Sequence, residues 1–270
     1  MTISNAIWEK YIAGLRKVNV AASNQFSSFM LARMPVTPAV LNELIEYAYA
    51  LATKYGEAAA ELAAQMYDAV ATASGLVLEP AVPAATATMQ EAAKTVVGTL
   101  KTGNSSVVAD AVGRLVKQAG VDTTVQNALR DGAQWAWIPR GDTCAFCIAL
   151  ASNGWQDASR RVLKGNHAEH IHANCDCTFA VRFNENTDVE GYDPDRYEAM
   201  YLYELDANGN VRLDEDGDPV WRTETSSTAR INAMRRDFYA ANRARIERQN
   251  VSDAVKRIEL NSPVAEQATV

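Results

Sequence analysis

The chain has 270 residues, of which 48% are apolar and 22% are charged, a composition typical of globular rather than disordered proteins. This length fits one elongated domain or two modest ones, each with enough apolar sequence for a core. A formal net charge of -7 argues against a surface built as a whole to bind nucleic acid, because phosphate contacts need clustered Lys and Arg.

The sequence predicts neither a secretion signal nor a membrane span. Residues 1–17 carry four charged side chains among scattered apolar ones, so they lack the apolar core of a signal peptide. No later stretch has the roughly 18 to 20 apolar residues that a span needs. We therefore expect the protein to fold in a cytoplasm, where clustered cysteines are better candidates for metal ligands than for disulfides.

Two long helices are predicted before residue 80. Apolar residues at helical spacing predict the first over about residues 5–20. Thr37 and Pro38 then supply an N-cap followed by a proline at the first helical position, and an apolar face continues to about Thr72. Gly56 is a candidate for a break in this second helix. Residues 1–80 form the predicted N-terminal helical region.

A non-helical segment separates this region from a second helical one, residues 81–137. Residues 76–88 contain two prolines among small side chains, which is typical of a linker or a sharp change of direction. Beyond it, Gly103-Asn104 and Gly120 mark two expected breaks. The pattern therefore predicts three shorter helices, over residues 89–101, 105–118 and 123–135.

After residue 138 the pattern changes to short strands and loops. Residues 178–183 alternate as a strand does, and a β-hairpin segment is predicted over residues 201–225 because Asn-Gly and Asp-Gly turns punctuate it. The acidic turn at Asp206 suggests calcium, but Val211 stands where an EF-hand needs glycine and Gly217 where it needs glutamate. Hairpins are the better interpretation, with strands at residues 201–205, 211–213 and 220–222.

A basic helix is predicted from Thr228 to about Ile258, within a C-terminal segment of residues 226–270. Three interleaved acidic residues favour a plain solvated face. Contact with an acidic partner or with nucleic acid through the Arg230–Arg248 helix is the alternative. The arginines concerned are Arg230, Arg235, Arg236, Arg243, Arg245 and Arg248.

All four cysteines and all three histidines lie between residues 144 and 177. Cys144-Ala-Phe-Cys147 has the spacing with which one turn presents two thiolates to a metal ion, and His172, Cys175 and Cys177 follow about 25 residues later. A closed tetrahedral zinc site takes four ligands, so one of these five groups lies outside the coordination sphere. The sequence therefore predicts a structural Zn²⁺ in a Cys/His core of residues 138–200.

Other uses of this cluster fit less well. A redox C-x-x-C needs a thioredoxin-like βαβ context that the flanking sequence lacks. A nucleobase deaminase would match His167-Ala-Glu169, but its C-x-x-C should follow that element, whereas here it precedes it. A metal-dependent hydrolase is the alternative that stays open, with His167, Glu169 or His170 doing acid-base work at an open metal position. No catalytic set stands out in the sequence.

Two sequence runs resemble the core of the minor head proteins of tailed bacteriophages, in the Mu F-like and prophage head morphogenesis group. They are Ile138-Pro-Arg-Gly-Asp-Thr-Cys-Ala-Phe-Cys-Ile-Ala-Leu-Ala-Ser-Asn-Gly-Trp155 and His170-Ile-His-Ala-Asn-Cys-Asp-Cys-Thr178. The resemblance covers about residues 136–200. It implies a virion protein of the head interior or portal vertex, made in the bacterial host cytoplasm. Its implied partners are the portal and other head proteins, and packaged DNA is then the nucleic acid that the basic helix would contact.

We therefore expect a mainly α fold with a small α+β zinc-binding module. Its expected parts are a helical N-terminal region, a Cys/His knuckle with short strands, β-hairpins and a C-terminal helix. The expected function is that of a structural, non-enzymatic minor head protein acting in head assembly. The alternative is a metal-dependent hydrolase, either a nuclease or a phage-borne toxin, that uses the Cys/His module.

Overall fold

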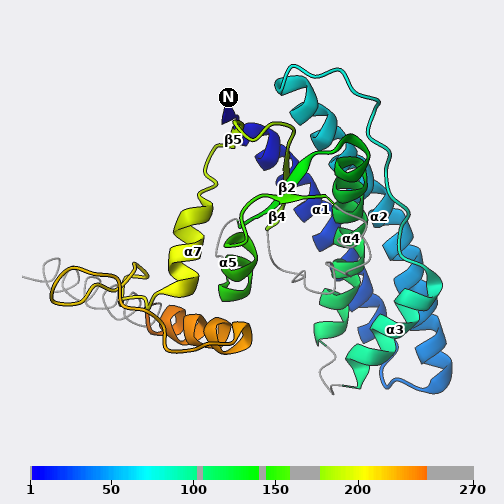
Figure 1. The fold of residues 1–270 in the computed structure, drawn as a ribbon. Coiled ribbons are helices and arrows are strands. Elements are labelled where there is room, and N and C mark those ends of the chain that lie inside the picture. Colours follow the sequence, from blue (N-terminus) through cyan, green and yellow to red (C-terminus); the bar gives the residue numbers. More distant parts are fainter. Residues whose placement is uncertain (1, 102–105, 140–143, 159–176, 242–270) are drawn as a thin grey trace, which may run out of the picture. The chain divides into compact units, whose positions relative to one another are not determined.

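The computed structural model describes residues 2–101, 106–139, 144–158 and 177–241 (Figure 1). In these ranges the chain is mainly helical with a few short strands, as the sequence predicts. It divides into two compact units. The first unit comprises Met1–Thr143 and Asn153–Asp193, and the second comprises Cys144–Ser152 and Pro194–Val270.

Four helices make up most of the first unit: α1 (Asn5–Leu31), α2 (Pro38–Ala73), α3 (Met89–Leu100) and α4 (Ser106–Asp131). The side chain of Thr37 caps α2 as predicted, and Thr88 caps α3 in a reciprocal pair with Glu91. Helix α1 runs past its predicted end near residue 20, because Phe26 and Met30 extend its buried side. None of the helices in the described ranges is both long and apolar enough to cross a membrane.

Two predicted helix breaks are wrong, because the glycines concerned serve close packing instead. Gly56 lies inside α2, where a Cβ would meet Thr86 at 3.0 Å. Gly120 lies inside α4, which joins two helices that the sequence analysis separated. A Cβ on Gly120 would come within 2.9 Å of the Tyr11 hydroxyl and 3.2 Å of the Ala59 carbonyl oxygen. Tertiary packing therefore overrides the low helix propensity of glycine at both places.

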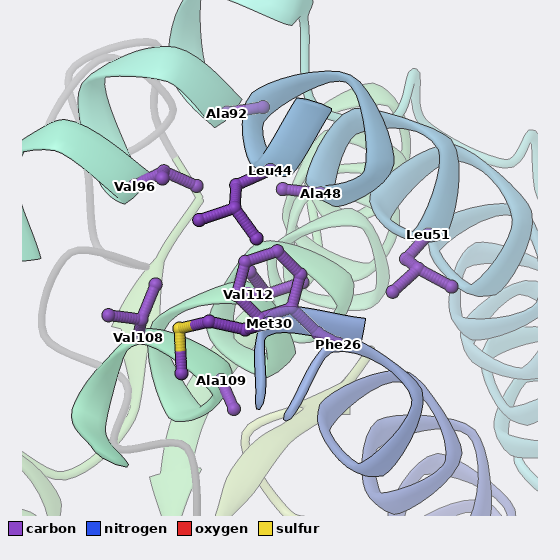
Figure 2. Close-up of a cluster of buried hydrophobic side chains, with 10 residues drawn as sticks. All are labelled: Phe26, Met30, Leu44, Ala48, Leu51, Ala92, Val96, Val108, Ala109 and Val112. Carbon is purple, nitrogen blue, oxygen red and sulfur yellow. The ribbon is translucent and has the colours of Figure 1, made fainter. Parts of the chain in front are cut away.

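The four helices share a buried apolar cluster (Figure 2). Each fully buried Val, Leu, Met or Phe in it contributes roughly 1.5–3 kcal/mol relative to exposure, so this cluster is a main source of the unit's stability. Alanines at several of its positions let the helices approach one another. The cluster consists of Phe26, Met30, Leu44, Ala48, Leu51, Ala92, Val96, Val108, Ala109 and Val112.

Two small sheets complete the first unit. Strand β2 (Gln134–Ile138) lies between β3 (Gln156–Asp157) and β4 (Thr178–Arg182), and both pairings are antiparallel. The predicted strand at residues 178–183 is confirmed, whereas Trp135 belongs to β2 and not to the end of a helix. A second, parallel pair joins β1 (Thr2–Ile3) to β5 (Asp188–Val189).

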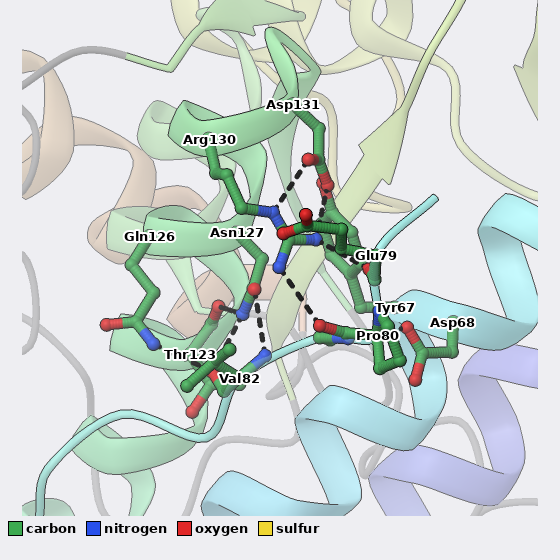
Figure 3. A network of polar contacts seen from close by, with 11 residues as sticks. Tyr67, Asp68, Glu79, Pro80, Val82, Thr123, Gln126, Asn127, Arg130 and Asp131 are labelled. Atoms are coloured by element: carbon green, nitrogen blue, oxygen red, sulfur yellow. Dashed lines mark hydrogen bonds and ion pairs between the residues drawn. The ribbon is translucent and has the colours of Figure 1, made fainter. Parts of the chain in front are cut away.

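The predicted linker at residues 76–88 is non-helical, but side chains of α2 and α4 hold its backbone in place (Figure 3). The Asn127 amide oxygen accepts from the Val82 N–H, and its NH₂ group donates to the Val82 carbonyl, both at 2.9 Å. The Arg130 guanidinium donates to two further carbonyls of the segment, and the Asp68 carboxylate accepts from the Ala81 N–H at 2.9 Å. The segment is therefore a fixed strap, and the expected boundary near residue 80 falls inside one compact unit.

The second unit contains α5 (Ala145–Ala151), α7 (Pro194–Leu202) and a helix over residues 227–241, the start of the predicted basic helix. Ala145, Ile148 and Met234 form its buried core. The strand predicted at residues 201–205 is partly wrong, because α7 includes its first two residues. The Asp206 and Asp214 turns join short bridged segments, as the predicted hairpins require.

We predict that Gly120→Ala destabilises the protein by about 1–3 kcal/mol, since the new Cβ is forced against a carbonyl oxygen in a packed interface. The matched control is Gly98→Ala on α3, where nothing lies within 4 Å of the added Cβ. That control should stabilise the helix by about 0.5–1 kcal/mol. Urea unfolding of both variants measures the effects, and equal stability of the two would contradict the packing account.

A second prediction concerns Asp131, which accepts hydrogen bonds from the Tyr67 hydroxyl at 2.9 Å and from Arg130 at 2.7 Å (Figure 3). The hydrogen bond from Arg130 lowers the pKa of this carboxyl, so its stabilisation is present above the unfolded pKa of about 3.9 and is lost as pH falls further. Asp131→Asn should cost about 1–2 kcal/mol at neutral pH and less below about pH 3. Glu57→Gln, on the exposed side of α2, is the control. Urea unfolding at several pH values measures the stability difference between Asp131→Asn and the wild type. A stability difference that does not change with pH would contradict the role given to the ionised Asp131 carboxylate.

Candidate metal centre

Two of the five predicted zinc ligands lie together at the start of α5. Cys144 is the N-cap residue of this helix and Cys147 lies in its first turn, so the C-x-x-C spacing puts both side chains on one side of the turn. Their sulfur atoms are 3.6 Å apart. Cys147 is buried at 1% exposure, whereas Cys144 is half-buried.

This sulfur separation fits two ligands of one metal ion. In a tetrahedral site with Zn–S bonds of about 2.3 Å, neighbouring sulfurs lie roughly 3.8 Å apart. The sulfurs of a disulfide would instead lie about 2.05 Å apart. The turn therefore holds the pair at the spacing that a bound zinc needs, and it also lets the two thiols share a hydrogen bond. When bound, zinc would supply a fixed cross-link between these sulfurs and its other ligands.

The apolar core of the second unit holds this turn in place. Ala145 and Ile148 directly follow Cys144 and Cys147 in the sequence, and both pack against Met234 of the 227–241 helix. Tyr197 and Met200 of α7 pack against the same cluster. The cysteine pair is thus built on a short helix whose orientation is set by burial, which limits how far the two sulfurs can separate.

The other candidate ligands are placed less completely. Cys177 is buried at 4% exposure, directly precedes β4 and belongs to the first unit. His172 and Cys175 lie outside the described residues, so the structure leaves the five-ligand prediction untested. Among the residues that are described, no group of three or more Cys, His, Asp or Glu is arranged to hold a metal ion.

The C-x-x-C spacing predicted a knuckle-like turn at Cys144, whereas the structure has helix α5 there. The signal was present, because Ala145-Phe-Cys-Ile-Ala-Leu-Ala151 contains no glycine or proline and is rich in helix-forming alanine and leucine. The spacing of the two cysteines indicates metal ligands, but the residues between and after the cysteines determine that the segment is a helix. The proposed hydrolase residues His167, Glu169 and His170 lie outside the described part of the chain.

The described half of the basic helix contacts its own unit. Arg230 donates to the Glu224 carbonyl oxygen at 2.8 Å and lies over the Tyr201 ring. Arg236 pairs with the Glu224 carboxylate at 3.0 Å, and Arg235 donates to Asn232. These contacts favour the plain structural interpretation for this half of the helix. Arg243, Arg245 and Arg248 lie outside the described residues.

Comparison with known proteins identifies one family. A family model described as VG15 protein matches residues 2–203, which is about three quarters of the chain. The match includes α5 and ends at residue 203, one residue after the end of α7. No curated protein and no solved structure matches the chain.

We predict that the purified protein binds about one zinc ion per chain and that Cys144→Ser and Cys147→Ser each lower this content and the melting temperature. Structural zinc contributes on the order of 10 kcal/mol of apparent binding free energy in small modules, so its loss should be plain in a melting curve. Ser152→Ala, at the opposite end of α5, should keep both properties. Elemental mass spectrometry with parallel melting curves measures them, and full zinc content in both serine variants would exclude the pair as ligands.

Proposed function

The chain belongs to the VG15 protein family, a family of viral proteins, and from this premise we propose that it is a minor head protein of a tailed phage or prophage. In this proposal it is a structural component of the virion, at the portal vertex or in the head interior. It is made in the bacterial host cytoplasm and binds the portal and other head proteins. Its role is head assembly, without catalysis.

The observation that carries the proposal is the cysteine pair at the start of α5. Its spacing suits a zinc ligand pair, and it lies in one of the two sequence runs that resemble minor head proteins. The adjoining residues Ala145 and Ile148 are buried in a core, which favours a structural role for the turn over an open, solvent-filled site. A zinc ion bound there would join this turn to the ligands that follow it in the sequence.

The long helices of the first unit suit a protein that forms part of an assembly. Helices α1, α2 and α4 bury an apolar cluster together, and the strap along α2 and α4 is fixed by several hydrogen bonds. This packing gives a stable body on which contact surfaces for a portal can be displayed. Contact of packaged DNA with Arg230 or Arg236 is not part of the proposal, because both side chains are engaged by Glu224.

We predict that the protein enters phage heads when it is co-expressed with the portal and capsid proteins of the phage that encodes it. Sedimentation followed by mass spectrometry of the head fraction should detect it, and a Cys144→Ser/Cys147→Ser double variant should be depleted from that fraction. Ser152→Ala is again the control. Heads that never contain the wild-type protein would contradict the proposal. DNA or peptidoglycan hydrolysis that is lost in His170→Ala would favour the hydrolase alternative.

A further inference from the structure

Residues 203–222 form a small three-sided β structure that is closed by its own backbone. The Glu204 N–H donates to the Val220 carbonyl at 2.9 Å, the Val220 N–H to the Arg212 carbonyl at 3.0 Å, and the Arg212 N–H to the Glu204 carbonyl at 2.8 Å. Each of the three short segments therefore bonds both others. We call this structure the β-ring.

An eight-residue repeat in the sequence explains the closure. Leu205-Asp-Ala-Asn-Gly209 and Leu213-Asp-Glu-Asp-Gly217 have the same pattern, and Glu204, Arg212 and Val220 follow one another at intervals of eight residues. In each repeat the aspartate carboxylate accepts from the backbone N–H groups two and four residues later, at 2.8–3.0 Å. The glycines have φ values of 82° and 88°, which favour glycine. Two copies of one turn thus bring three segments together.

One face of the β-ring is apolar. The bridged residue pairs are Tyr203 with Trp221, Leu205 with Val211, and Leu213 with Pro219. Side chains of directly opposed residues lie on the same side of a β structure, and neighbours along a strand lie on the other side. The Tyr203 and Trp221 rings accordingly pack with centroids 4.6 Å apart. The six side chains of these pairs form what we call the ring face.

The opposite face carries the residues that alternate with these pairs, namely Glu204, Arg212 and Val220. Glu204 and Arg212, which alternate with the apolar positions, form an ion pair at 3.1 Å. Of the six side chains on the ring face, Leu205 is buried, whereas Leu213, Pro219 and Trp221 are exposed. These three side chains are available for contact with another molecule.

The ring face exposes large apolar side chains. Trp221 is 61% exposed and Leu213 is 56% exposed, whereas Trp8, Trp135 and Trp137 of the first unit are buried. The β-ring is anchored beside this face by Arg222, whose side chain is 2% exposed and pairs with Asp237 at 2.8 Å. Exposed apolar side chains gathered on one side of a fixed structure are typical of an interaction surface.

The charges around the ring face indicate the kind of partner. The two turns carry five carboxylates and no cationic side chain: Asp206, Asp214, Glu215, Asp216 and Asp218. Hydrogen bonds from the backbone N–H groups of Asn210 and Asn208 lower the pKa of Asp206, so this group is ionised at neutral pH. Arg212 already pairs with Glu204 and Arg222 with Asp237. The two turns, which we call the rim of the ring face, are therefore strongly negative.

We propose that the ring face is a docking surface for a protein segment in which an apolar side chain is flanked by Lys or Arg. The apolar side chain would contact Trp221 and Leu213, and its cationic neighbours would lie against the acidic turns. The negative rim would repel nucleic acid, and a second copy of this chain would bring two negative rims together. The β-ring lies almost entirely beyond the family match at residues 2–203, so this surface is an inference about this chain and not about the family.

Binding of a labelled lysine-rich peptide with a central Phe-Leu pair to the full chain tests the proposal. Fluorescence anisotropy should detect binding, and the same peptide with glutamates in place of its lysines should not bind. Glu215→Gln/Asp216→Asn/Asp218→Asn should weaken binding about tenfold, from the usual size of three exposed charge contacts. These side chains are exposed, and the turn hydrogen bonds use only backbone groups of these residues.

A matched variant, Glu46→Gln/Glu57→Gln/Glu61→Gln, removes the same charge from the exposed side of α2 and should bind as the wild type does. The peptide should also shield Trp221 from acrylamide, a change that Trp221→Phe abolishes. If both triple variants lose binding equally, the peptide responds only to the net charge of the protein, and the proposal is overturned. Binding without shielding of Trp221, or dimerisation of the chain through this face, would overturn it as well.

Discussion

The first unit depends on how closely its three long helices approach one another, and glycine makes that approach possible. A Cβ at Gly14 of α1 would meet Leu62 of α2, and one at Gly120 of α4 would meet Tyr11 of α1, both at about 3 Å. Gly56 of α2 instead leaves room for Thr86 of the strap. The apolar cluster, the strap at residues 76–88 and β4 all lie on this helical framework, with α2 and α4 at its centre. A change that separates these helices therefore affects every other element of the unit.

The second unit depends on a smaller core that links the cysteine turn to distant sequence. Met234, which lies beyond the residues matched by the VG15 family, is fully buried against Ala145 and Ile148 on either side of Cys147. The C-terminal part of the chain thus helps to position the candidate zinc ligands. Arg230 and Arg236 of the 227–241 helix contact Glu224 of the same unit, so a basic sequence pattern does not leave these two side chains unpaired.

Local signals in the sequence predicted the elements they specify directly. Thr37-Pro38 marked the start of α2, and the alternation near residue 178 marked β4. The breaks predicted at Gly56 and Gly120 were wrong, because a glycine that breaks a helix and a glycine that admits a neighbouring segment look alike in sequence. The cysteine pair was recognisable from its spacing, whereas its burial depends on Met234, more than eighty residues away, and no local pattern encodes that contact. The β-ring was predicted only as hairpins, since its closure involves three segments at once.

X-ray absorption spectroscopy of the purified protein at the zinc edge tests the central claim most directly. If Cys144 and Cys147 are two ligands of a closed structural site, sulfur or imidazole from the cysteine and histidine cluster completes the coordination of the zinc ion. The spectrum should then be that of four-coordinate zinc with zinc–sulfur distances of about 2.3 Å. A spectrum dominated by oxygen or nitrogen ligands, or a protein that binds no zinc under reducing conditions, would contradict it.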